Sequence, residues 1–168
     1  MKNSNNLGLS EKFPAGIYYI GDLCYVMKNE LWEEWLELTS VCDSEGKVQN
    51  YEDGIYQFRG FNVGWHGTNY GDGVYLSDRM ANISKTNVVP VDSGTIGIIP
   101  LKALSDWLSH EEMDEVMTGT LNLVHRFDHD FHVELSVNMQ FGNLIIHTDG
   151  SDDYEEEEEY EFNDDNDL

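Results

Sequence analysis

Residues 133–148 read VELSVNMQFGNLIIHT, and this stretch gives the clearest secondary-structure pattern in the chain. From residue 133 to residue 140, apolar side chains alternate with polar ones, which is the period of a strand with one buried face. The Phe-Gly-Asn that follows is a turn sequence, and the apolar run after it is typical of a second strand. We therefore predict a strand over residues 133–140 and a terminal β-hairpin.

The chain that precedes this hairpin predicts more strands. Residues 17–27 are rich in β-branched and aromatic residues and contain a Gly-Asp kink, which is typical of two extended pieces. Residues 49–91 repeat Gly, Asn and Asp turn sequences around short apolar runs, a pattern that favours hairpins. Residues 95–100 form a short apolar strand that ends at a proline.

Two short amphipathic helices are also predicted. Apolar residues, including two tryptophans, recur at helical spacing after Asn29, which we expect to be the N-cap of a helix packed on a sheet. Residues 101–108 are compatible with a helical turn or two. Ser109 and Glu112 then form a capping box for the second helix. The predicted fold class is α+β, with a mainly antiparallel sheet and two short helices.

The chain of 168 residues is strongly acidic, with a formal net charge of −24. Its last twenty residues contain twelve of the 33 Asp and Glu residues and no Lys or Arg, and the rest of the chain still carries −12. Such charge repels nucleic acid and anionic membranes and attracts cationic surfaces. We expect a basic protein surface as the partner, with no direct nucleic-acid binding and no membrane, whereas the oligomeric state stays open.

Composition predicts a single folded domain between two flexible ends. We expect a flexible N-terminus at residues 1–12, one α+β domain at residues 13–148, and a disordered acidic tail at residues 149–168. Cys24 and Cys42 do not form a C-x-x-C motif, and no apolar run reaches the ~20 residues that span a membrane. The N-terminal residues lack the apolar core of a signal peptide. A reducing cytoplasm is the expected location.

Three segments carry a family resemblance: GIYYIGDLCYV at 16–26, TNYGDGVYL at 68–76 and VDSGTIGIIP at 91–100. They are similar to the motifs G-x-Y-x-I-G-D-P-C-Y-V, Y-G-D-G-x-Y and V-D-A-G-x-I-G of an uncharacterised group of small phage and bacterial proteins. Leu23 stands where that group has proline, and Ser93 where it has alanine. The resemblance implies a compact β-rich fold and a phage or prophage setting, and hence a host-cell cytoplasm. It implies no activity, and an alanine in relatives argues against Ser93 as a nucleophile.

Asp22, Asp72 and Asp92 are candidate catalytic or ligand-binding residues, because each lies within two residues of a glycine in one of these motifs. Loop carboxylates that meet can bind Mg²⁺ or Ca²⁺, and we add His66 as a fourth member of such a cleft. The alternative is that Asp-Gly pairs form turns, in which the carboxylate accepts backbone N–H groups.

Residues 125–132, which read HRFDHDFH, form the densest group of metal-ligand types. On one strand, alternation places Asp128, Asp130 and His132 on a common face, which makes them candidate metal ligands. Same-face residues of one strand lie ~6.6 Å apart, which is too far for chelation without a distant residue such as His66. A polar face on an edge strand is the alternative, and no cofactor is expected.

The many aromatic residues between positions 18 and 75 fit either a sheet core or a ligand pocket with Trp65 and His66 at its mouth. For the acidic tail, three hypotheses stay open: a solvated segment, a mimic of the DNA phosphate backbone, or a docking arm for a basic protein groove. The docking arm consists of Tyr154, Glu155, Glu156, Glu157, Glu158, Glu159, Tyr160, Glu161 and Phe162.

These observations predict a non-catalytic, acidic accessory protein of phage type that acts by protein–protein contact, as an inhibitor or decoy of a host factor with a basic surface. The alternative is a small-ligand-binding protein or hydrolase whose site is built from the Asp-Gly loops and His66, with or without a metal. A structural accessory that only self-associates is a third possibility.

Overall fold

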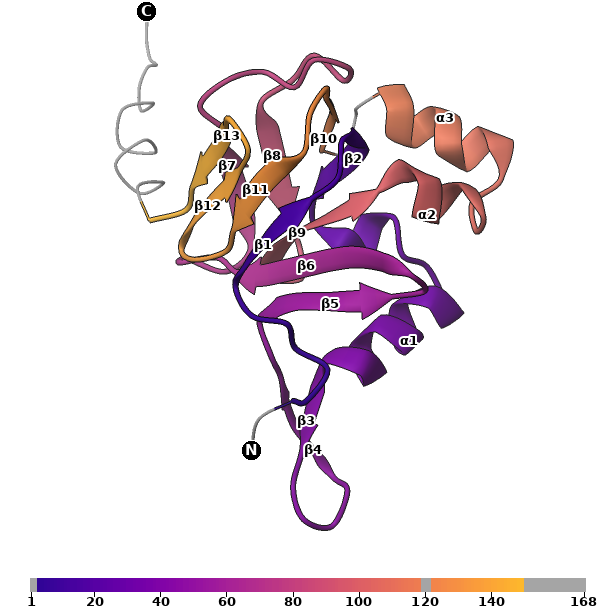
Figure 1. Ribbon diagram of the computed structural model, residues 1–168, viewed down its shortest axis with the longest axis vertical. Helices are drawn as coiled ribbons and strands as arrows, with labels where there is room; N and C mark the ends of the chain where they lie inside the picture. Colours follow the sequence, from indigo (N-terminus) through magenta and orange to yellow (C-terminus); the bar gives the residue numbers. More distant parts are fainter. Residues whose placement is uncertain (1–2, 119–121, 150–168) are drawn as a thin grey trace, which may run out of the picture.

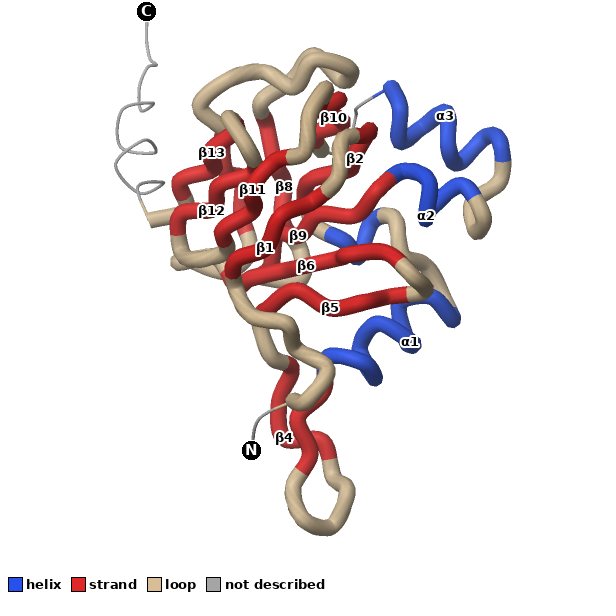
Figure 2. Tube along the Cα trace, viewed as in Figure 1, coloured by secondary structure: helices blue, strands red, loops and turns tan. Residues whose placement is uncertain are grey.

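A computed structural model describes residues 3–118 and 122–149 of the chain. It contains two larger antiparallel sheets, two two-stranded sheets and three short α-helices within these residues (Figures 1 and 2). The predicted α+β class with a mainly antiparallel sheet is therefore confirmed. The predicted acidic tail lies outside the described residues, except for Asp149.

The central layer is a five-stranded sheet in the order β10-β2-β9-β6-β5, with every pair antiparallel. Alternate residues of its strands point to opposite faces, so Tyr18 and Ile20 enter one core and Tyr19 enters the other. Both faces are buried, which explains the nearly continuous apolar runs in the sequence. The strands are β2 (Gly16–Gly21), β5 (Gly54–Phe58), β6 (Phe61–Gly67), β9 (Thr95–Pro100) and β10 (Leu123–Phe127).

Helices cover one face of this sheet (Figure 1). Trp35 is fully buried there, with its ring edge-on to Tyr56, Phe58 and Trp65 at centroid distances of 5.4–5.5 Å. Trp32 is partly buried against Trp65, so both tryptophans of the predicted helix pack on the sheet as expected. The helices are the 3₁₀ turn η1 (Leu23–Tyr25), α1 (Glu30–Thr39), α2 (Leu101–Ser105) and α3 (His110–Thr118).

Both predicted helices begin where expected, but only α3 has the predicted capping hydrogen bonds. Ser109 and Glu112 exchange hydrogen bonds of 2.8 and 3.1 Å, which is the predicted capping box of α3. Asn29 is the N-cap residue of α1, but its side chain makes no capping bond and its φ is +56°. No helix within residues 3–118 and 122–149 is long and apolar enough to cross a membrane.

A second sheet, in the order β1-β11-β12-β13, covers the other face. The single strand predicted over 133–140 is wrong, because the chain reverses at Leu135–Val137 into a β11–β12 hairpin. The hydroxyl of Ser136 bonds the N–H and C=O of Asn138 and so stabilises this turn. The predicted terminal hairpin is confirmed as β12–β13. These strands are β1 (Ser10–Phe13), β11 (Phe131–Glu134), β12 (Asn138–Phe141) and β13 (Leu144–His147).

The N-terminal segment is structured from residue 3 onward, so the predicted flexible stretch at residues 1–12 is corrected. Leu7 and Gly8 exchange backbone hydrogen bonds of 2.7 and 2.9 Å with Ile55 of β5. Ser10–Phe13 then form β1, which pairs with β11. The chain thus crosses from one sheet to the other before residue 13, and the local polarity of the segment does not reveal these long-range bonds.

Two small hairpin-like sheets complete the fold. In the first, β3 (Ser40–Cys42) pairs with β4 (Val48–Tyr51) and projects away from the body (Figure 1). In the second, β7 (Gly73–Leu76) pairs with β8 (Val88–Val91), and the Ser77–Ile146 bridge places β7 beside β13. The predicted hairpin before residue 67 is present as β5–β6.

Candidate functional site

The loop carrying Asp92 meets Asp22 at the end of β2. The Asp22 carboxylate is fully buried. Its Oδ2 accepts the backbone N–H groups of Asp92 at 2.6 Å and of Ser93 at 2.7 Å. Its Oδ1 accepts the Cys24 N–H at 3.0 Å and the Ser93 hydroxyl at 2.8 Å. A carboxylate offers about four lone-pair sites, so these four donors saturate Asp22.

The third motif loop reaches the same place. The Asp72 carboxylate lies over Gly94, with Oδ1 3.8 Å from the position that a Cβ on Gly94 would occupy. Asp72 and Asp92 are both exposed, and Asp92 accepts a hydrogen bond of 2.8 Å from the Tyr25 hydroxyl. We call Asp22, Cys24, Asp72, Asp92 and Ser93 the aspartate cluster.

The negative charge of the cluster acts on the Cys24 thiol. Burial raises the pKa of Cys24 to about 12, with further contributions from the charges of Asp22, Asp92 and Asp72. Burial and the hydrogen bond to Asp92 also raise the pKa of Tyr25. Cys24 is therefore protonated near neutral pH and is a poor nucleophile.

His66, the fourth residue predicted for this cleft, is held elsewhere. Its Nδ1 lies 2.8 Å from the carbonyl oxygen of Gly67, and its Nε2 lies 3.5 Å from the carboxylate of Asp53. The fold thus brings together the three predicted aspartates, whereas the side-chain contacts of His66 are with Gly67 and Asp53.

The segment 125–132 does not form the single strand that its alternation predicted. His125 belongs to β10 of the five-stranded sheet and His132 to β11 of the other, and the polar residues 128–130 connect them. Asp130 accepts the Ala15 N–H at 3.1 Å, and His132 Nε2 lies 2.8 Å from the Ser10 hydroxyl. Asp128 is exposed on this connection.

No metal centre is formed by the part of the chain that the structure describes, where no three His, Cys, Asp or Glu side chains have the geometry to hold an ion. His125 has a different role, because it is buried and its Nδ1 accepts the Asn82 N–H at 3.0 Å. Burial and the neighbouring Arg79 lower the pKa of His125. The docking-arm residues 154–162 lie outside the described residues.

The aromatic residues predicted as either core or pocket are mostly core. Tyr19, Tyr56, Phe58 and Trp65 are buried on the helix side of the central sheet, and Tyr18 is buried on the other side. Trp65 is not at a cavity mouth with His66, because its Nε1 donates to the carbonyl oxygen of Glu52 at 3.1 Å inside the fold.

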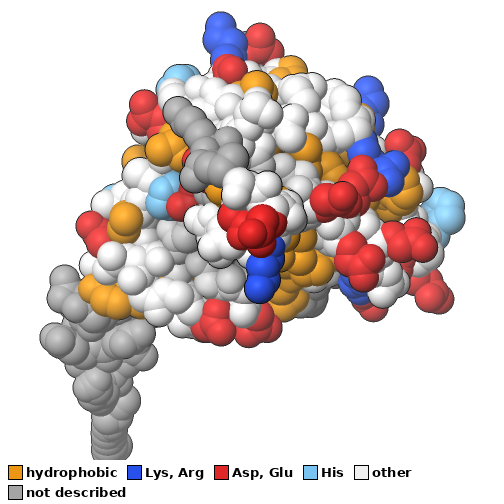
Figure 3. Space-filling view, turned by 90° about the horizontal axis from the view of Figure 1, so that it is seen from below, with side chains coloured by type: hydrophobic (Ala, Val, Ile, Leu, Met, Phe, Trp, Pro, Cys, Tyr) orange, Lys and Arg blue, Asp and Glu red, His pale blue; other side chains and the backbone are white. Residues whose placement is uncertain are grey.

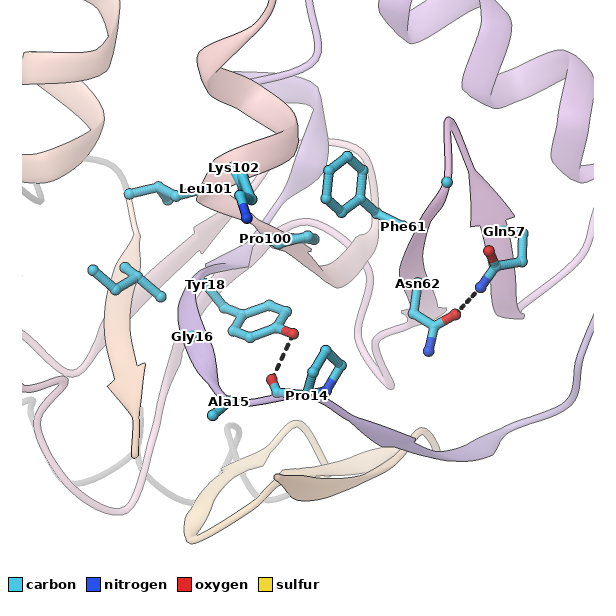
Figure 4. A pocket seen from close by; sticks show the side chains of 12 residues that line it. Pro14, Ala15, Gly16, Tyr18, Gln57, Phe61, Asn62, Pro100, Leu101 and Lys102 are labelled. Atoms are coloured by element: carbon cyan, nitrogen blue, oxygen red, sulfur yellow. Dashed lines mark hydrogen bonds between the residues drawn. The ribbon is translucent and has the colours of Figure 1, made fainter. Parts of the chain in front are cut away.

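One apolar cavity, of about 690 Å³, was not predicted from the sequence (Figure 4). It lies where β6 and β9 separate, since their pairing ends at Gly64 and Ile98 although both strands continue. The Tyr18 hydroxyl at its wall donates to the carbonyl oxygen of Pro14 at 2.8 Å. The lining residues are Pro14, Ala15, Gly16, Ile17, Tyr18, Gln57, Gly60, Phe61, Asn62, Pro100, Leu101 and Lys102.

Comparison of the chain with models of known protein families, with curated proteins and with solved structures gave no match. The resemblance of the three motif segments to small phage and bacterial proteins thus stays a prediction.

Proposed function

We propose that this protein is a non-catalytic accessory protein that acts by contact with a basic protein surface, as an inhibitor or decoy of a host factor. The observation that carries the proposal is the excess of carboxylates over Lys and Arg side chains on its helices. Helices α1 and α3 carry eight of them, and among the described residues Arg59 is the only Lys or Arg that pairs with any of these, through Glu34. Figure 3 shows Asp and Glu side chains spread over one face of the molecule.

The state of the aspartate cluster supports a non-catalytic role. A general base or a metal ligand needs a free lone pair, and all those of Asp22 are engaged by backbone and hydroxyl donors. The Ser93 hydroxyl donates to this carboxylate and has Thr95, rather than a histidine, as its other partner. The alternative of a hydrolase built from Asp22, Asp72, Asp92 and His66 therefore has less support.

The acidic tail fits the proposal as a docking arm, in which the carboxylates give long-range attraction and Tyr154, Tyr160 and Phe162 give anchoring contacts. The resemblance to phage proteins suggests the cytoplasm of a host cell as the setting. The carboxylates on the helices and those in the tail contribute separately to the attraction of a basic surface. Each set can be removed without the other.

The test is binding of a synthetic Lys- and Arg-rich peptide, measured by calorimetry at several salt concentrations against a neutral peptide of equal length. We compare the full chain, a chain ending at Asp149, and the variant Glu30→Gln, Glu33→Gln, Glu37→Gln. Gln49→Ala, Asn50→Ala is the matched control, because it alters exposed side chains without changing charge. We expect salt-sensitive binding that both charge-removing variants weaken. Equal affinity for the basic and the neutral peptide would contradict the proposal.

A second candidate function is binding of a small apolar ligand, which the cavity of Figure 4 favours. Ligand sites in proteins are typically concave, mostly apolar and of this size, with a few polar groups such as Gln57, Asn62 and Lys102 at the rim. Thermal melting with a panel of small apolar acids distinguishes the two functions. A stabilisation of several degrees that Phe61→Ala removes would favour the ligand-binding function.

A further inference from the structure

The β7–β8 hairpin exposes an apolar face. Antiparallel pairing places Val74 opposite Pro90 and Leu76 opposite Val88, so these four side chains share one side of the hairpin. Val74 is 55% exposed, Val88 is 40% exposed, and the other two are half-buried. We call Val74, Leu76, Val88 and Pro90 the outer strip.

The opposite side of the same hairpin already supplies the core. Tyr75, Val89 and Val91 are buried between the two sheets, at 0–2% exposure. A hairpin with one buried side normally turns polar side chains to water on the other. Strand β11 obeys this rule, because its exposed residues are His132 and Glu134. The outer strip departs from it, and contiguous exposed apolar side chains mark interaction sites.

Charge flanks one end of the strip. Gly73 pairs with Val91, so Asp72 and Asp92, the next residues outward on each strand, lie at the same end of the hairpin. Both carboxylates are exposed, and neither pairs with a Lys, Arg or His within residues 3–118 and 122–149. The other end of the hairpin is different in charge, because Arg79 lies 3.9 Å from Asp78 there and Lys85 is exposed in the connection.

We propose that the outer strip docks a segment of a basic protein in which apolar side chains are followed by Lys or Arg. The apolar side chains cover Val74, Leu76, Val88 and Pro90, and the basic side chains reach Asp72 and Asp92. This inference rests on the proposed function and adds to it the place of contact and the chemistry of the partner. The aspartate cluster then serves as the charged end of a docking surface.

Charge decides between the possible occupants. A second copy of the chain would bring another net charge of −24 against this surface. The chain's own residues 150–168 contain eleven carboxylates and no cation, so Asp72 and Asp92 would repel them. A basic partner gains attraction from the same two residues, and desolvated apolar contacts supply affinity beside them.

The experiment uses the full chain and two synthetic peptides of equal length and charge. In one peptide, three valines at every second position are followed by three lysines. The other peptide has serines in place of the valines. The test variant is Val74→Thr, Val88→Thr, which keeps the shape and strand propensity of both side chains. Val48→Thr is the matched control, because Val48 on β4 is 46% exposed, a value between those of Val74 and Val88. Melting temperatures confirm that the variants fold.

We expect the valine peptide to bind at least tenfold more tightly than the serine peptide, and the test variant to lose most of that difference while the control keeps it. Asp72→Asn, Asp92→Asn is expected to reduce the salt dependence. If both peptides bind with equal, salt-sensitive affinity, the proposed function stands and the outer strip is not its docking surface. If neither binds, both proposals fail.

Two further outcomes would overturn the assigned occupant. A concentration-dependent dimer in sedimentation that Val74→Thr, Val88→Thr abolishes would identify a second copy. A gain in affinity for the valine peptide when the chain ends at Asp149 would identify residues 150–168 as the occupant.

Discussion

Ser93 donates two hydrogen bonds to the buried carboxylate of Asp22, one from its backbone N–H at 2.7 Å and one from its hydroxyl at 2.8 Å. These bonds tie the β8–β9 loop to the end of β2, across 71 positions of sequence. The aspartate is therefore a structural residue of the fold as well as a member of the aspartate cluster.

We predict that Asp22→Asn lowers the free energy of unfolding by about 3 kcal/mol, because an amide nitrogen then faces buried N–H donors. Ser93→Ala should cost about 1 kcal/mol, since it removes one hydroxyl donor and leaves the three backbone N–H bonds to Asp22. Urea denaturation of the two variants measures the difference. An Asp22→Asn variant as stable as Ser93→Ala would contradict the structural role of the carboxylate.

The Cys24 thiol should be slow to react. With a pKa of about 12, only about one thiol in 10⁴ is ionised at pH 8, compared with roughly a quarter for an ordinary cysteine. We expect alkylation by iodoacetamide in a Cys42→Ser background to be at least a hundredfold slower than in a free peptide. The rate should rise up to high pH, and unfolding in urea should restore ordinary reactivity.

Stability should decline as the pH falls through the range in which free histidine takes up a proton. The pKa of folded His125 is lowered below its unfolded value of about 6.5, so the unfolded chain binds more protons between the two values. The stabilisation is complete above pH 6.5 and is lost as the pH drops below it. Urea denaturation at pH 7.5 and 5.5 should show a smaller difference for His125→Asn than for the wild type. His147→Asn, at an exposed position, is the control and should behave like the wild type.

Two tryptophans should differ widely in their contribution to stability. Trp35 is fully buried among aromatic rings, so Trp35→Ala should lower the free energy of unfolding by about 4 kcal/mol. Trp107 is 44% exposed and stacks on the Arg59 guanidinium at 3.7 Å, and Trp107→Ala should cost less than about 1 kcal/mol. Equal losses in denaturation would contradict the packing of α1.

Local patterns predicted the features that depend on neighbouring residues. The capping box of α3 and the strand that ends at Pro100 follow from propensity and spacing alone. The break at Ser136 was missed, because the turn keeps the alternation of buried and exposed residues through both arms of the hairpin. The division of residues 125–132 between two sheets depends on β1, which lies more than a hundred residues earlier.

The candidate site shows the same limit. The three Asp-Gly motifs predicted either separate turns or a common cleft. Choosing between these interpretations requires the distances between the loops, which the sequence does not contain. The structure joins Asp22, Asp72 and Asp92 but leaves His66 with Asp53. The outer strip was missed because GVYL and VVPV are apolar on both sides, so their pattern does not separate a core face from an exposed one.

The four hydrogen bonds of Asp22 have a consequence for recognition at a distance. Three of them, from Asp92 and Ser93, fasten the end of β8 to the central sheet, so the hairpin would meet the proposed partner already rigid and would lose little conformational entropy on binding. If that attachment were loosened, the same surface would lose more conformational entropy when it binds, and its affinity would fall. A residue that no ligand can touch would then govern how tightly the surface binds.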